Sequence, residues 1–136
     1  MLFKIMKISH GWFTVSVKGC TLTASNVTGY DVGTELLKTL CDLLNGCKTE
    51  ERIVWNHEGG EHYLWMGIDG DTLQLEAWGS EDDVLKITGD IIEATKEVLE
   101  EFELYENGNG RSRYDHHWNP FPQREYDELK KLVRKK

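Results

Sequence analysis

Hydrophobic and polar residues alternate between positions 53 and 78, and this pattern predicts three antiparallel strands. Two turn-forming dipeptides, Gly59-Gly60 and Asp69-Gly70, divide the segment into the runs 53–58, 61–68 and 71–78. Successive side chains of a strand point to opposite faces, so each run has one apolar and one mainly polar face. We expect the apolar face to form the core, with these residues: Ile53, Trp55, Leu64, Met66, Ile68, Leu73, Leu75 and Ala77.

The opposite face of these strands is polar except for three large aromatic side chains, Tyr63, Trp65 and Trp78. Such a group has two explanations. Either the last helix or residues 111–122 cover it, or it is an exposed patch that contacts a partner. The sequence leaves both open. The other residues of this face are Val54, Asn56, Glu58, Glu61, Thr72, Gln74 and Glu76.

A second alternating segment, Trp12 to Ser25, predicts another hairpin with its turn at Lys18-Gly19. Residues 2–8 alternate too weakly to decide between an additional strand and a loose leader. The core side of the hairpin is expected to hold Phe13, Val15, Val17, Cys20, Leu22 and Ala24.

Apolar residues at helical spacing predict two helices, over residues 32–44 and about 91–105. Asp31 and Asp90 are suited to cap their N-termini, and Asn45-Gly46 ends the first helix. Each helix has one apolar stripe, so we expect both on the same face of a sheet. The acidic residues of the second helix should lie mostly on its solvent side: Glu97, Glu100, Glu101 and Glu103.

Residues 111–136 are predicted to form a basic loop and a C-terminal helix that begins near Pro122. The stretch Tyr114 to Pro122 is rich in aromatic and imidazole side chains. It either folds back onto the body of the protein or forms a recognition loop. In the second case His116, His117 and Trp118 would contact a partner.

A short strand over residues 84–88, after an acidic turn at 80–83, completes the order of elements. Strands that are joined by hairpins and grouped beside helices are typical of α+β proteins. We therefore predict a single domain over residues 1–136. It consists of an antiparallel sheet of about five to six strands, with two helices packed on one face and a C-terminal helix.

Charge is distributed unevenly along the chain. Residues 1–110 hold 8 Lys and Arg against 20 Asp and Glu, a net charge of −12, whereas residues 111–136 carry a net charge of +4. An acidic body repels nucleic acid and acidic membranes and attracts a basic protein partner, although solubility alone also explains the acidity. The basic tail lies at the negative end of the last helix dipole.

Cysteine and histidine spacing argues against a metal site. Three cysteines without a Cys-x-x-Cys pair are typical of free, buried thiols in a reducing cytosol. His57 and His62 enclose two glycines and are five residues apart, which does not fit a helical zinc motif. As opposed hairpin residues they supply two ligands, and His10, His116 or His117 would have to supply the others. We expect no metal and no cofactor.

Several short segments carry a resemblance to a known group of proteins: Gly11-Trp12, residues 23–26, residues 61–65 and residues 119–122. Together they make the chain similar to a widespread group of small bacterial proteins without an established activity. The resemblance implies a bacterial α+β frame and no catalytic residues. In size and acidity the chain is also similar to immunity proteins, which neutralise toxins, but this is not a sequence match.

These observations favour a non-enzymatic, cytoplasmic binding protein, in character an immunity-type inhibitor of a basic protein partner. Aromatic residues would anchor the partner and nearby glutamates would steer its approach. The alternative is a small enzyme or a ligand- or metal-binding domain that uses His57, His62, His116 and His117. The expected partner contacts are Tyr63, Trp65, Trp78, Glu58, Glu61, Glu76, His116, His117 and Trp118.

Overall fold

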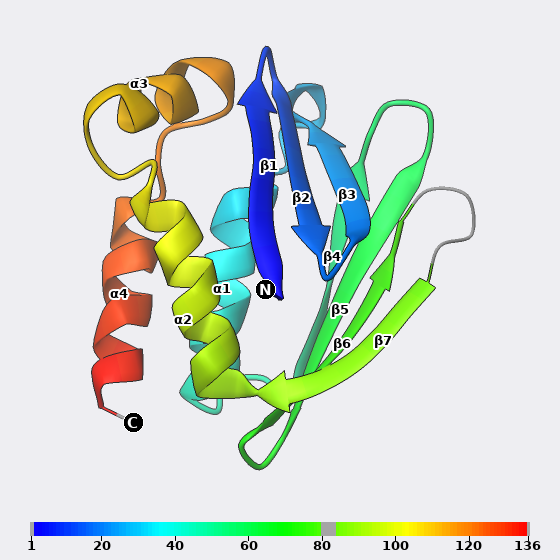
Figure 1. Ribbon diagram of the computed structural model, residues 1–136, viewed down its shortest axis with the longest axis vertical. Helices are drawn as coiled ribbons and strands as arrows, with labels where there is room; N and C mark the ends of the chain where they lie inside the picture. Colours follow the sequence, from blue (N-terminus) through cyan, green and yellow to red (C-terminus); the bar gives the residue numbers. More distant parts are fainter. Residues whose placement is uncertain (1, 80–83, 136) are drawn as a thin grey trace.

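The computed structural model describes residues 2–79 and 84–135, and Figure 1 shows how their elements are arranged. The predicted acidic turn at 80–83 lies outside the described residues. The elements are β1 (Phe3–Ser9), β2 (Trp12–Val17), β3 (Cys20–Ser25), a short 3-10 helix η1 (Asn26–Thr28), α1 (Val32–Leu44), β4 (Glu50–Asn56), β5 (Glu61–Asp69), β6 (Thr72–Trp78), β7 (Val84–Asp90), α2 (Ile91–Glu103), α3 (Gly108–His117) and α4 (Gln123–Arg134).

The strands form two antiparallel sheets, with the orders β1-β2-β3 and β4-β5-β6-β7. The α+β class is confirmed, whereas the prediction of one sheet with about five to six strands is wrong. In the described residues β3 packs against β4, β5 and β6 without pairing with them. A Cβ atom added to Gly79 would lie 2.7 Å from the carbonyl oxygen of Thr21. The first sheet therefore lies closely against one face of the second and does not extend its edge.

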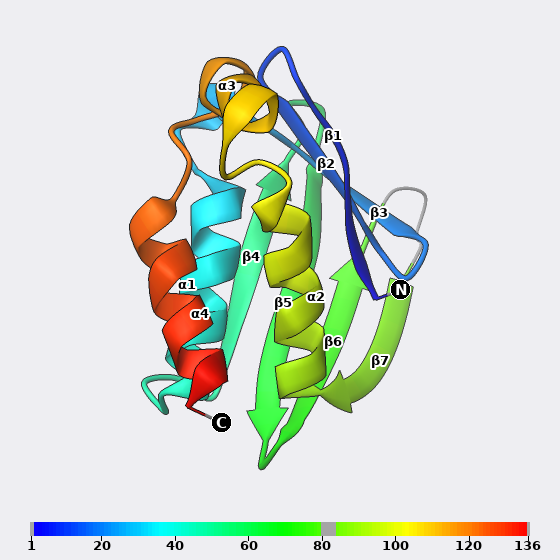
Figure 2. The same cartoon turned by 60° about the vertical axis from the view of Figure 1, so that its left-hand side comes forward.

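Helices cover the remainder of the same face. Figure 2 shows α1 and α2 in front of the second sheet, with α4 outside them. Helix α1 contacts β4, α2 contacts β1, β6 and β7, and α4 packs against both α1 and α2. Asp31 caps α1 by accepting a hydrogen bond from the Thr34 amide, and Asp90 caps α2 in the same way. A C-terminal helix is present as predicted, whereas the predicted pair of helices on one face of a single sheet is replaced by two sheets and four described α-helices. None of the described helices has the length and apolar character needed to cross a bilayer.

The core is built from the predicted faces of the strands and helices. Ile68 is half-buried, and the other predicted core residues of β4 to β6 are at most 7% exposed. The aromatic ring of Phe13 lies at the centre, in contact with Trp55, Phe102, Tyr114 and Trp118. Cys20 and Cys41 are buried, as predicted, whereas Cys47 is exposed.

The hairpins of the second sheet are offset from the predicted pairing by two residues. Trp55 pairs with His62 and Asp69 pairs with Thr72, so the first turn is centred on Glu58-Gly59 and the second on Gly70-Asp71. Glu58 takes a left-handed conformation with φ 71° in the first turn. Because an offset of two residues keeps every side chain on its face, the assignment of core and outer residues is unaffected.

Residues 3–9 form a strand with an irregular hydrophobic pattern. The register between β1 and β2 shifts between Ile5 and Lys7, which leaves Met6 as a bulge residue. The buried positions are consequently Phe3, Ile5 and Ile8, spaced by two and then three residues. This bulge explains why the alternation was too weak to predict a strand.

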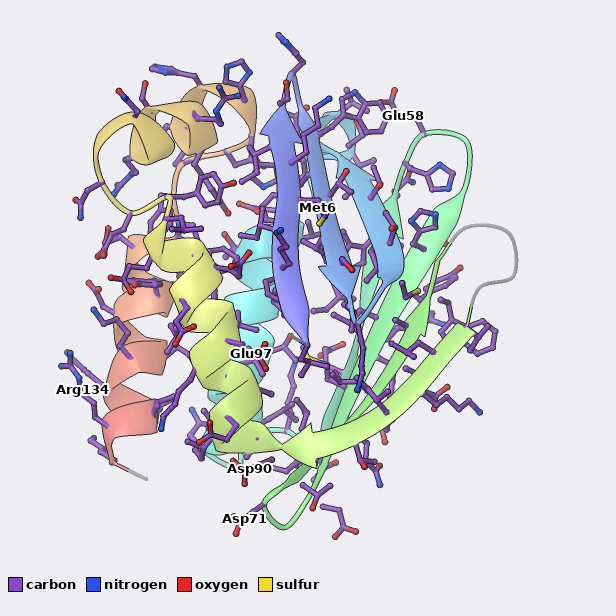
Figure 3. The ribbon with its side chains drawn as sticks, in the orientation of Figure 1. Met6, Glu58, Asp71, Asp90, Glu97 and Arg134 are labelled. Carbon is purple, nitrogen blue, oxygen red and sulfur yellow. The ribbon has the colours of Figure 1, made fainter. Side chains whose placement is uncertain are left out.

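Two glutamates of α2 bind the edge of β1, which corrects the prediction that they face solvent. The carboxylate of Glu97 accepts a hydrogen bond from the Leu2 amide, and that of Glu101 accepts one from the Ile5 amide, both at 2.7 Å. Figure 3 shows Glu97 on α2 beside the first residues of β1. Glu101 is only 8% exposed. These carboxylates satisfy amides that a sheet edge would otherwise leave unpaired.

Residues 108–117 form the helix α3, where a loop was predicted. The segment is rich in Gly, Asn and Ser, which are weak helix formers, and Tyr114 is its one fully buried residue. Tertiary packing therefore stabilises this helix, because Tyr114 contacts Phe13, Phe102 and Phe121 in the core. The aromatic stretch folds back onto the body, as one of the two interpretations proposed.

Candidate functional site

Three aromatic side chains and one carboxylate occupy neighbouring positions on the outer face of the second sheet. Tyr63 on β5 pairs with Trp78 on β6, and Trp65 pairs with Glu76. These four residues thus form two adjacent rows on one face. Together with Arg52, the partner of Trp65 on β4, they line a surface groove, which we call the outer groove.

The outer groove lies on the face of the second sheet opposite the one that α1 and α2 cover. Helix α4 packs against α1 and α2, and α3 packs against β1, so residues 111–136 lie elsewhere. Trp78 is 45% exposed, and Tyr63, Trp65 and Glu76 are half-buried. Of the two explanations for these aromatic residues, the structure supports an exposed patch.

Trp65 divides the outer face into two grooves. A Cβ atom added to Gly67 would lie 2.5 Å from Cη2 of Trp65, so the indole lies along its own strand above this glycine. A neighbouring groove on the far side of Trp65 extends towards Lys86 and Thr88 on β7. Trp65 and Glu76 line both grooves. Gly67 is therefore required for the position that Trp65 adopts.

A cation already lies against one of the aromatic rings. The guanidinium carbon of Arg52 is 4.9 Å from the centroid of the Tyr63 ring, within the range of a cation–π interaction. The Tyr63 hydroxyl donates a 2.6 Å hydrogen bond to Glu61, and this bond raises the pKa of Tyr63. The Tyr63 side chain consequently contacts a cation with its ring and a carboxylate with its hydroxyl group.

The three acidic residues predicted to contact a partner lie at different distances from the outer groove. Glu76 lies within the outer groove, Glu61 at the start of β5, and Glu58 is exposed in the β4–β5 turn, where Figure 3 labels it. Sequence reasoning missed Arg52 and Lys86. Extending the alternation backwards from Val54, and along the strand over 84–88, would have found both.

His57 and His62 form a pair at the β4–β5 hairpin. Their ring centroids are 4.5 Å apart, and Nδ1 of the buried His62 accepts a hydrogen bond from the Thr23 amide at 3.0 Å. Within residues 2–79 and 84–135 no three His, Cys, Asp or Glu side chains are grouped to hold a metal ion. His62 instead connects β5 of the second sheet to β3 of the first.

The contact between His62 and Thr23 should weaken in acid. Burial, and then the neighbouring His57, lower the pKa of His62. A group with a lowered folded-state pKa binds a proton more readily when unfolded, so the stability of the protein should fall as pH drops below about 6.5. Urea denaturation across pH 5 to 7.5 measures this effect. His62→Gln should flatten the profile, whereas His116→Gln should leave it unchanged; equal profiles for all three proteins would contradict the prediction.

His117 of α3 forms a second pair with His10, separate from the first. Nδ1 of His117 accepts a hydrogen bond from the His10 amide at 3.1 Å, and the two rings make an edge contact. His116 is exposed beside Ser112. In the described residues these side chains form no cluster with His57 and His62. The structure thus gives no support to the alternative in which the four histidines share one site.

Trp118 is a core residue, which corrects its prediction as a partner contact. It is 4% exposed, and its indole N–H donates a 2.9 Å hydrogen bond to Asp31. Phe121, three residues later, is also part of the core and is 5% exposed. Sequence alone could not separate these two aromatic residues from exposed ones, because the loop that carries them has no periodicity.

No protein-family model, curated protein or solved structure matches this chain. The candidate site therefore depends on its geometry alone.

Proposed function

We propose that the protein is a non-enzymatic binding module that captures a basic protein partner on the outer groove. By this proposal it acts as an inhibitor of immunity type, by covering the partner. The observation that carries the proposal is the exposure of Trp78 beside Tyr63 and Trp65 on the outer face of the second sheet. Tryptophan and tyrosine are the most frequent anchors of protein interfaces.

Charge supports a basic partner. The first 110 residues carry a net charge of −12, and Glu61 and Glu76 border or line the groove. The electrostatic field of a negatively charged protein accelerates the approach of a cationic surface, and salt screens this field. The aromatic anchors would then determine how long the complex lasts.

Replacing Trp78 with alanine should weaken partner binding about 30-fold, equivalent to about 2 kcal/mol. Trp78 is preferable to Trp65 for this test, because Trp65 also packs over Gly67. The partner is first isolated by affinity capture, and its dissociation constant is then measured by calorimetry. Raised salt should slow association without abolishing binding.

Leu104→Ala is the matched control, because Leu104 is 66% exposed and lies at the end of α2, away from the groove. This variant should bind like the unaltered protein. If the Trp78 and Leu104 variants bind the partner equally well, the outer groove is not the interface and the proposal fails.

A further inference from the structure

We infer that the outer groove is a cage for an organic ammonium group, which in the partner is the side-chain amine of lysine. This inference rests on the proposed function and specifies the chemistry of the group that enters the groove. Three aromatic side chains, Tyr63, Trp65 and Trp78, and one carboxylate, Glu76, line the groove. Aromatic faces attract cations through their quadrupoles, and a carboxylate adds a direct charge.

The two tryptophan rings are available to a ligand. Among the described residues neither Trp65 nor Trp78 makes a ring contact with another aromatic side chain, in contrast to the dense ring contacts of the core. The position of Trp65 over Gly67 keeps it along the strand, so it forms a wall and does not close the groove. Apart from the position of Trp65 over Gly67, neither indole ring is packed against another aromatic ring of the described residues.

Glu76 has the properties of a ligand-binding carboxylate. It lies directly opposite Trp65 and two residues from Trp78 on the same face. It is half-buried, and within the described residues it has no hydrogen-bond or ion-pair partner. Lys86 lies opposite Glu76 on β7, but no ion pair joins the two side chains. The Glu76 carboxylate can therefore bind a cation that enters the groove.

The protein itself demonstrates that this surface holds a cation. Arg52 places its guanidinium group over Tyr63 at the edge of the groove. The two tryptophans and Glu76 line the remainder of this open groove. A compact ammonium group can contact walls on several sides, whereas a planar guanidinium group prefers to stack on one ring and bind a carboxylate in a bidentate manner. The geometry therefore favours an ammonium group.

Nuclear magnetic resonance of the indole N–H groups tests this inference with tetramethylammonium as the probe. We expect a saturable shift of the Trp65 and Trp78 signals, and none for the buried Trp55 and Trp118. Tert-butanol, a neutral molecule of similar shape, and sodium chloride at equal ionic strength should not produce it. Tighter binding of guanidinium than of tetramethylammonium would overturn the assignment to an ammonium group.

Two variants identify the groups that bind the probe. Glu76→Gln and Trp78→Ala should each weaken tetramethylammonium binding about fivefold or more. Glu100→Gln, at an exposed position on α2, is the matched control and should bind normally. The inference is overturned if tetramethylammonium gives no saturable shift, or if Glu76→Gln binds like the control.

The same variants separate this inference from the proposed function. If Trp78→Ala abolishes partner binding while tetramethylammonium gives no response, the interface is correct and the ammonium cage is wrong. If tetramethylammonium binds as expected but Trp78→Ala leaves partner binding intact, the cage exists and the proposed interface is wrong.

Discussion

Replacing Trp118 with alanine is expected to lower the free energy of unfolding by about 3–5 kcal/mol. The indole ring is packed against Phe13 with centroids 5.2 Å apart, and its removal would leave a cavity at the centre of the core. The indole N–H also donates a hydrogen bond to Asp31, the residue that caps α1. The substitution thus removes core volume and a side-chain hydrogen bond to the start of α1.

Urea denaturation measures this change, and His116→Ala is the control from the same short segment. His116 is exposed, so its replacement should alter stability by about 0.5 kcal/mol or less. A loss below about 1 kcal/mol for Trp118→Ala would mean that the aromatic stretch after α3 is not part of the core.

Leu64→Ala should lower the free energy of unfolding by about 2–5 kcal/mol, whereas Tyr63→Ala at the adjacent position should lower it by about 1 kcal/mol or less. Leu64 is 2% exposed and pairs with Ile53 and Ala77 on the core face. It also borders a small apolar cavity beside Leu36 and Val98, which the substitution would enlarge. Tyr63 points to the opposite face and loses mainly its contact with Arg52.

Thermal and urea denaturation of the two variants can be compared directly, because the residues are neighbours in one strand. Equal losses would show that the outer aromatic side chains are as structural as the core. In that case the outer groove would no longer be available as a binding surface, and the functional proposal would lose its basis.

Local periodicity was sufficient to predict most elements. The alternation of residues 53–78 assigned Leu64 and Trp65 to opposite faces. This assignment is correct although the pairing is offset by two residues from the predicted one. The caps Asp31 and Asp90 marked the starts of two helices, because capping is a local interaction between a side chain and nearby amides.

Elements that are stabilised by contacts between segments far apart in the sequence were not predicted. The bulge at Met6 interrupted the pattern of β1, whose edge is completed by Glu101 from a helix almost a hundred residues later. Helix α3 has little intrinsic preference for helix and depends on the burial of Tyr114. The two sheets approach closely where Thr21 of β3 lies beside Gly79, and no local signal in the sequence describes this contact.

The candidate site divides in the same way. The sequence by itself determined that Tyr63, Trp65 and Trp78 share one face of a sheet, because the period of a strand is a property of the backbone. Only the tertiary structure decided that Trp78 on this face is exposed, that Trp118 is buried, that Arg52 lies over Tyr63, and that Glu76 has no partner among the described residues. Each of these depends on where α3, α4 and neighbouring strands pack, and packing is set by contacts between segments far apart in the chain.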